Sequence, residues 1–258
     1  MTWTLDSEIE YKVYPRNTLT SVAIELRFNT ILLVQKDNLV ADYQNLVRFL
    51  FPVYAIEQGT QVDILPDGIR QQSQIRHVFS NPEQKCTLRL TTESLSLELG
   101  SHSDREDLLQ KFTVGLVSFE KVWPDMTATR FGIRYVNQVS KAVIEQDLKR
   151  EVSWEDLLHP DFLRMPANMA DLNDTVFHCE LNSVASVGRL VVRYGLLPHQ
   201  SQERTEVAFK YDCDRFIDGP VEKDKLNGMA EMFIEDIYQA FSGSRGDTLV
   251  EWMELPTQ

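Results

Sequence analysis

The chain has 258 residues, of which 43% are hydrophobic and 25% are charged, so its composition is that of a folded protein and excludes a disordered or low-complexity segment. Its 26 lysines and arginines are outnumbered by 39 aspartates and glutamates, which gives a net charge of −13. Because this charge repels phosphates, we expect no binding to free duplex nucleic acid, and a partner protein with a basic surface instead.

The cysteines and the N-terminus indicate the compartment. Cys86, Cys179 and Cys213 are odd in number and far apart, which argues against a disulfide framework and for a reducing environment. The N-terminus lacks the basic and apolar segments of a signal peptide, and no apolar run approaches the roughly 20 residues of a membrane span. We therefore expect a cytoplasmic protein that does not contact a membrane.

The first half of the chain alternates strand and helix patterns. Residues 19–28 alternate apolar and polar side chains and predict a half-buried strand. Helical spacing predicts a helix from Asp37, with Asp37 or Asn38 as its cap, to Pro52. A capping box at Ser103-Asp104-Arg105-Glu106 predicts a second helix that ends at Trp123. Between the two helices, an antiparallel meander is expected at Ile69–Phe79, Lys85–Thr91 and Leu95–Leu99.

The second half is predicted to repeat this order. Residues 128–139 alternate as a strand, and Ser153 opens a short helix. A loop at 160–174 and a long helix from about Val221 to Phe241 enclose three further strand patterns, at Val176–Val184, Gly188–Leu196 and Thr205–Tyr211. The apolar segment Leu249–Leu255 is a candidate strand to close the sheet.

The element order predicts an α+β fold. Each half, 1–126 and 127–258, has the order β-α-β-β-β-α, and together they are expected to form one compact unit. An internal duplication is inferred from this order alone. Long helices covering a curved antiparallel sheet resemble the TATA-binding-protein-like and helix-grip arrangements, which carry no function by themselves.

Three local patterns carry a family resemblance. They are the segment Arg130-Phe131-Gly132-Ile133-Arg134-Tyr135-Val136-Asn137, the segment Tyr211-Asp212-Cys213-Asp214-Arg215-Phe216, and the helix that ends at Phe241 before Trp252. Together they resemble a sporadically distributed family of bacterial proteins of uncharacterised function, with a Gly-x-Arg-Tyr-x-Asn segment. The resemblance implies a bacterial cytoplasmic protein. Patchy distribution suggests an accessory system, such as a defence or toxin–antitoxin module.

Arginines within strands are the main candidates for ligand binding. Arg130 and Arg134 point to one face of their strand, and Tyr135 and Asn137 to the other. Other strands carry further arginines, namely Arg27, Arg76, Arg89, Arg189 and Arg193. If several share an open sheet face, their guanidinium groups would bind a small anion, and the candidate residues are Arg130, Arg134, Tyr135, Asn137 and Arg193. The alternative is that each arginine pairs with a cross-strand acid, such as Glu25, Glu98 or Glu180.

No metal or cofactor site is predicted. Asp212 and Asp214 face the same way and could bind a hard divalent cation, but no second acidic cluster completes the coordination. The alternative is a solvated strand end followed by a turn at Asp218-Gly219-Pro220. The five histidines lack the spacing of zinc ligands, and no cofactor is expected.

The sequence favours a non-enzymatic role, because it contains no nucleophile elbow, phosphate loop or dinucleotide fingerprint. The leading hypothesis is an acidic protein-binding module, an accessory or neutralising component of a bacterial defence or toxin–antitoxin system. The first alternative is a sensor of a small anionic ligand or nucleotide that uses the arginine-bearing sheet face. The second is a metal-dependent phosphodiesterase built around Asp212 and Asp214.

Overall fold

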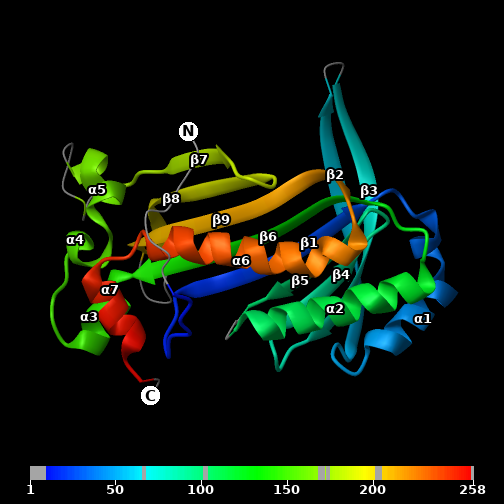
Figure 1. The fold of residues 1–258 in the computed structure, drawn as a ribbon, viewed down its shortest axis with the longest axis horizontal. Coiled ribbons are helices and arrows are strands. Elements are labelled where there is room, and N and C mark those ends of the chain that lie inside the picture. Colours follow the sequence, from blue (N-terminus) through cyan, green and yellow to red (C-terminus); the bar gives the residue numbers. More distant parts are fainter. Residues whose placement is uncertain are drawn as a thin grey trace. The chain divides into compact units, whose positions relative to one another are not determined.

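The computed structural model describes residues 10–65, 68–100, 104–167, 172, 175–200 and 205–256. It is an α+β fold in which nine strands form one open antiparallel sheet, in the order β2-β3-β4-β5-β1-β6-β9-β8-β7 (Figure 1). The predicted α+β class with an antiparallel sheet is therefore confirmed. Among the described residues, no helix is both long enough and apolar enough to cross a membrane.

The chain divides into two compact units that are interleaved in sequence. Unit 1 consists of Met1–Ser21, Arg134–Phe216 and Glu231–Gln258, and unit 2 of Val22–Ile133 and Ile217–Ala230. Three strands and one helix pass from one unit into the other, namely β1 (Leu19–Phe28), β6 (Ala128–Ser140), β9 (Thr205–Val221) and α6 (Leu226–Ser242). Each unit has its own core.

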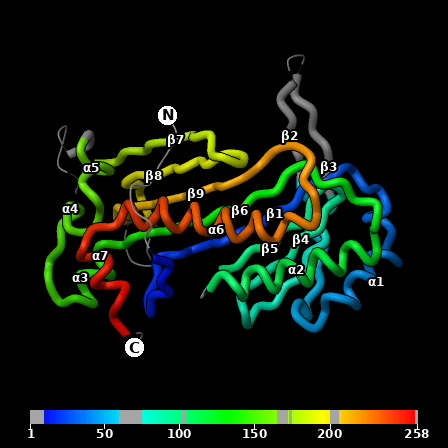
Figure 2. Tube along the Cα trace, viewed as in Figure 1, coloured from blue at the N-terminus to red at the C-terminus, as the bar shows by residue number. Residues whose placement is uncertain are grey.

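Unit 2 consists mainly of strands that helices cover on one face. Its further strands are β2 (Val53–Leu65), β3 (Gly68–Asn81), β4 (Cys86–Leu90) and β5 (Ser94–Leu99). Its further helices are η1 (Leu32–Gln35), α1 (Asp37–Val47), α2 (Arg105–Val122) and η2 (Lys223–Lys225). In the chain trace, β5 runs between β4 and β1, with α2 along these strands (Figure 2).

The core of unit 2 lies between α1, α2 and one face of its strands. Alternate residues of β1 and β5, such as Leu26 and Leu95, are fully buried and lie opposite one another across the strand pair. Tyr43 of α1 packs edge-on to Phe79, donates a hydrogen bond to the carbonyl oxygen of Gly115 at 3.1 Å, and contacts Trp123. Because apolar side chains take this face, the intervening polar residues lie on the face away from α2.

Unit 1 packs a second group of helices on its strands. Its further elements are α3 (Lys141–Leu148), α4 (Trp154–Leu157), α5 (Pro160–Ala167), β7 (Cys179–Val184), β8 (Arg189–Gln200) and α7 (Asp247–Glu254). Strand β9 contacts α6 through Tyr211, whose ring lies 5.5 Å from that of Phe241. Arg215, also on β9, is completely buried. It pairs with Asp236 of α6 at 2.7 Å, and its guanidinium lies over the ring of Phe233.

Most predicted elements are confirmed, but several are wrong or missing. Strand β2 and helix α3 were not predicted, and helix α5 occupies the start of the segment expected to form a loop. The segment Leu249–Leu255 is largely helical, in α7, so it does not close the sheet. Strand β9 continues to Val221 through the expected turn at 218–220, and Gly219 takes a φ of +114° there.

The helix caps also differ from those predicted. The N-cap position of α1 is occupied by Lys36, rather than by Asp37 or Asn38, and its side chain makes no capping hydrogen bond. Helix α2 is capped by Asp104, whose carboxylate accepts a hydrogen bond from the backbone N–H of Asp107 at 2.8 Å, and Ser103 lies outside the described residues. The capping box of α4 is confirmed, with Ser153 and Asp156 bonding reciprocally.

Candidate anion-binding site

A row of alternating charges crosses the strands of unit 1. Arg193 of β8 pairs with Glu180 of β7 at 2.7 Å, and its cross-strand neighbour on β9 is Asp212. Asp212 in turn accepts two hydrogen bonds from Arg134 of β6, at 2.7 and 2.5 Å. This bidentate contact raises the pKa of Arg134. In these cases the alternative interpretation, that strand arginines pair with nearby acids, describes the structure.

Arg130 has a similar environment in unit 2. Its guanidinium contacts Glu25 at 3.1 Å and Asp218 at 3.4 Å. The same oxygen of Glu25 also accepts a hydrogen bond from Arg27, at 2.7 Å. Arg130 and Arg27 therefore share one carboxylate.

Tyr135 and Asn137 lie away from the arginines with which they were grouped. They alternate with Arg134 along β6, and both are buried. The side-chain oxygen of Asn137 accepts a hydrogen bond from the Thr18 hydroxyl at 2.8 Å. The structure therefore gives Asn137 a partner within the core of unit 1, and does not bring the five candidate residues together in one pocket.

Of the two candidate metal ligands, Asp212 takes part in a structural contact. Both oxygens of Asp212 are engaged by Arg134, and the Asp212 side chain is only 8% exposed. Within the described part of the chain, no group of three or more His, Cys, Asp or Glu side chains could hold a metal ion together. The arrangement around Asp212 is therefore an ion pair that ties β6 to β9.

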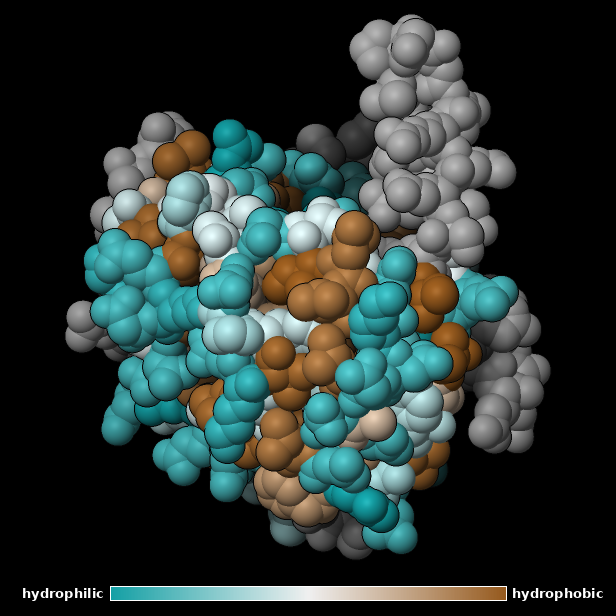
Figure 3. Space-filling model, turned by 90° about the vertical axis from the view of Figure 1, so that its right-hand side faces the viewer, coloured by the Kyte–Doolittle hydropathy of each residue, from teal (hydrophilic) through white to brown (hydrophobic). Residues whose placement is uncertain are grey.

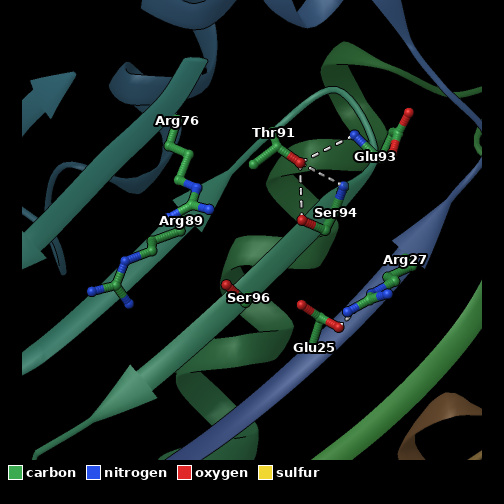
Figure 4. Close-up of a pocket in the computed structure, with 8 residues that line it drawn as sticks. All are labelled: Glu25, Arg27, Arg76, Arg89, Thr91, Glu93, Ser94 and Ser96. Carbon is green, nitrogen blue, oxygen red and sulfur yellow. Dashed lines mark hydrogen bonds and ion pairs between the residues drawn. The ribbon is translucent and has the colours of Figure 1, made fainter. Parts of the chain in front are cut away.

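A pocket of about 400 Å³ opens on the polar face of unit 2, away from α2 (Figure 4). We call it the arginine pocket. Its described lining consists of Glu25, Arg27, Arg76, Arg89, Thr91, Glu93, Ser94 and Ser96. These side chains come from β1, β3, β4, β5 and the turn between β4 and β5.

The sheet register explains why a pocket forms there. Ser96 of β5 lies between Arg89 of β4 and Glu25 of β1, and Ser94 lies opposite Arg27. Serine side chains are short, whereas the arginines and the glutamate on the flanking strands are long. The polar face is therefore hollow above β5 and walled on both sides.

The three arginines of the pocket differ in their partners. Arg27 pairs with Glu25, and Arg89 pairs with Glu98 at 2.6 Å. Arg76 forms no ion pair with any residue that the structure describes, although Glu57 lies directly opposite it in the register of β2 and β3. Its guanidinium instead extends toward Gly59, where an added Cβ would lie 3.3 Å from the Arg76 Cζ. Gly59 thus leaves space for this side chain.

The hydroxyl groups of the pocket fall into two kinds. The Thr91 hydroxyl is committed to the β4–β5 turn, where it accepts hydrogen bonds from the backbone N–H groups of Glu93 and Ser94 and contacts the Ser94 hydroxyl (Figure 4). The Ser96 hydroxyl has no hydrogen-bond partner among the described residues. Arg76 and Ser96 therefore retain hydrogen-bonding capacity that a ligand could use.

The sequence contained only part of this site. The alternation predicts Arg27, Arg76 and Arg89 as strand arginines but assigns no role to Ser94 or Ser96. The signal that could have found them is the alternation Ser94-Leu95-Ser96-Leu97, which places two small polar side chains on the face opposite the leucines.

Comparison with known proteins adds no identification. No protein-family model matches the chain, and no curated protein matches its sequence. The function is therefore argued from the arginine pocket itself.

Proposed function

We propose that this protein binds a small anionic ligand in the arginine pocket, as a sensor or binding protein. The observation that carries the proposal is Arg76, a partly buried arginine that lines the pocket and has no acidic partner among the described residues. A guanidinium left without a partner in such a place is stabilised when a phosphate or carboxylate enters, since charge-assisted hydrogen bonds replace contacts with water.

The pocket supplies matching groups around Arg76. Arg89 extends from the neighbouring strand on the same side, and the Ser96 hydroxyl lies between the arginines of β3 and β4 and the Glu25–Arg27 pair (Figure 4). A planar guanidinium donates two parallel hydrogen bonds to a phosphate or carboxylate, while a hydroxyl elsewhere in the pocket can bind another polar group of the ligand. All of these groups belong to strands, which hold them in fixed register.

The test is a titration of the full chain with small anions at low ionic strength, followed by NMR of the arginine Nε–H groups. Inorganic phosphate, dimethyl phosphate and acetate are suitable probes. We expect saturable binding that Arg76→Ala weakens by about 10- to 100-fold, the range expected for hydrogen bonds to a charged group. Arg193→Ala is the matched control, because Arg193 is also a strand arginine but pairs with Glu180 in unit 1. Equal binding by all three proteins would refute the proposal.

A second candidate function is recognition of a partner protein with a basic surface. The observation that favours it is a group of exposed apolar side chains, gathered on the side of unit 2 where η1 and α1 lie (Figure 3). Leu32 and Phe49 are 68% and 70% exposed, and Val53 and Ile56 of the edge strand β2 are also exposed. Since the chain carries a net charge of −13, a partner that covers these residues would be attracted most strongly if it is basic.

Its test compares variants in a pull-down from the native host. We expect one basic protein to be retained by the wild type and lost with Phe49→Asp. Val184→Asp is the matched control, because Val184 is 69% exposed but lies in unit 1. Retention that is the same for Phe49→Asp and the wild type would contradict this candidate.

The broader setting is also a proposal. Membership of the sporadic bacterial family, a cytoplasmic location and a neutralising role in a defence or toxin–antitoxin system are consistent with the partner-binding candidate. A TATA-binding-protein-like or helix-grip arrangement with internal duplication is proposed on the antiparallel sheet and the helices that cover it. The phosphodiesterase alternative has no observation in its favour, since Arg134 engages Asp212.

A further inference from the structure

The charges around the arginine pocket have both signs. Of the described residues that line it, three are arginines and two, Glu25 and Glu93, are glutamates. A site for a highly charged anion would gain from arginines alone, because each carboxylate repels the ligand. The two glutamates therefore bear on which anion the pocket can accept.

Most of these charges are already balanced within the protein. Glu25 holds both Arg27 and Arg130 through one oxygen, and Glu98 holds Arg89. The carboxylate of Glu93 accepts a hydrogen bond from the Thr30 hydroxyl at 3.0 Å and forms no ion pair with a described residue. Arg76 is thus the one lining arginine that has no acidic partner in the described part of the chain.

This balance limits the charge of a bound ligand. One negative charge next to Arg76 is neutralised, whereas a second or third charge has to approach carboxylates or compete for arginines that Glu25 and Glu98 already hold. Such competition separates existing pairs at 2.6 to 3.1 Å. The whole chain, at −13, adds repulsion for polyanions at low salt.

We infer that the ligand of the arginine pocket carries a single negative charge, as a phosphodiester or a monocarboxylate does, together with hydrogen-bond donors that face the glutamates. Arg76 on β3 binds the anionic group, while the Ser96 hydroxyl, two strands away on β5, and the Glu93 carboxylate bind other polar groups of the ligand. This inference rests on the proposed anion-binding function and specifies the class of ligand that the same site binds.

The experiment is a charge series on the full-length protein. Dimethyl phosphate, inorganic phosphate and pyrophosphate carry about one, two and three negative charges near neutral pH, and each is titrated at low ionic strength. We expect the affinity to fall along the series, with pyrophosphate at least about tenfold weaker than dimethyl phosphate. An affinity that rises with charge, as unscreened arginines alone would give, would overturn the inference.

A variant tests the reason for this order. Glu25→Gln removes one carboxylate while keeping the side-chain shape, and it releases Arg27 and Arg130 from their shared partner. We expect the preference to move toward pyrophosphate by at least about tenfold relative to the wild type. Glu180→Gln is the matched control, because its pair with Arg193 lies in unit 1, outside the pocket, and the wild-type preference should be retained.

The outcomes separate this inference from the proposal on which it rests. If the wild type binds no member of the series, the anion-binding function itself is refuted. If it binds them with affinity that increases with charge, or if Glu25→Gln leaves the order unchanged, only the inference of a singly charged ligand fails. Thermal unfolding of each variant, compared with the wild type, confirms that the fold is retained.

Discussion

The ion pair between Asp212 and Arg134 predicts how unit 1 responds to loss of one carboxylate. Asp212→Asn keeps the shape of the side chain and removes its charge. The substitution weakens or removes two charge-assisted hydrogen bonds from Arg134, at 2.7 and 2.5 Å. The Asp212 side chain is 8% exposed, but that of Arg134 is 50% exposed, so water can partly solvate the guanidinium that remains.

This geometry sets the size of the effect. A hydrogen bond to a charged group contributes about 1.5–3 kcal/mol, and exposure of one partner lowers the value, so we expect a loss of about 1–2 kcal/mol. At about 2–4 °C per kcal/mol for a domain of this size, the melting temperature should fall by about 2–8 °C. Glu180→Gln is the control, because its pair with Arg193 is exposed on both sides and should contribute less than about 1 kcal/mol.

The assay is urea unfolding of the wild type and both variants, at low and at high salt. We expect the effect of Asp212→Asn to persist at high salt and that of Glu180→Gln to disappear. A carboxylate retained for metal binding usually destabilises the fold, so its amide variant is more stable than the wild type. An increase in stability for Asp212→Asn would therefore refute the assignment of a structural role and revive the metal-site alternative.

Three further predictions follow from individual contacts. Gly195→Ala should destabilise the protein by about 1–3 kcal/mol, because the added Cβ would lie 2.0 Å from the carbonyl oxygen of Phe177. Gly228→Ala, at an open position on α6, should instead stabilise it by up to about 1 kcal/mol, and thermal melts giving both variants the same sign would contradict the structure. Burial raises the pKa of Tyr43, Tyr211 and Cys213, so the native state keeps protons that the unfolded chain releases above the ordinary values of 9.0 for cysteine and 10.0 for tyrosine. The contribution of these groups to the free energy of unfolding is therefore fully present below pH 9. It should fall as the pH rises further, by up to about 1.4 kcal/mol per pH unit for each group. Urea midpoints that stay constant up to about pH 11 would contradict this.

The part of the fold that was predictable from the sequence is the part with one buried and one polar face. Strand β5, and strand β1 from Val22 onward, alternate buried and more exposed residues, because α2 covers one side only. Strand β2 was missed because it lies at the sheet edge, where residues 55–58 are exposed on both faces and show no alternation. The segment that forms α7 is short and apolar, a pattern that fits strand and helix equally, although Leu249, Trp252 and Met253 have helical spacing.

The site was less predictable because it depends on register between strands. Alternation showed that Arg130 and Arg134 share a face, but not that Glu25 would hold the first and Asp212 the second. Likewise, nothing in the sequence places Ser96 between Arg89 and Glu25, since these residues become neighbours only when β4, β5 and β1 pair. Which acidic residue each arginine pairs with is therefore known only from the structure.

The central claim is that Arg76 is available to bind an anion, and a crystal structure with perrhenate tests it most directly. Perrhenate is a singly charged tetrahedral anion with a strong anomalous signal, so its position can be assigned without ambiguity. We expect a peak within hydrogen-bond distance of the Arg76 guanidinium, with the Glu25–Arg27 pair intact. An empty pocket, with Arg76 turned to pair with Glu57, would contradict it.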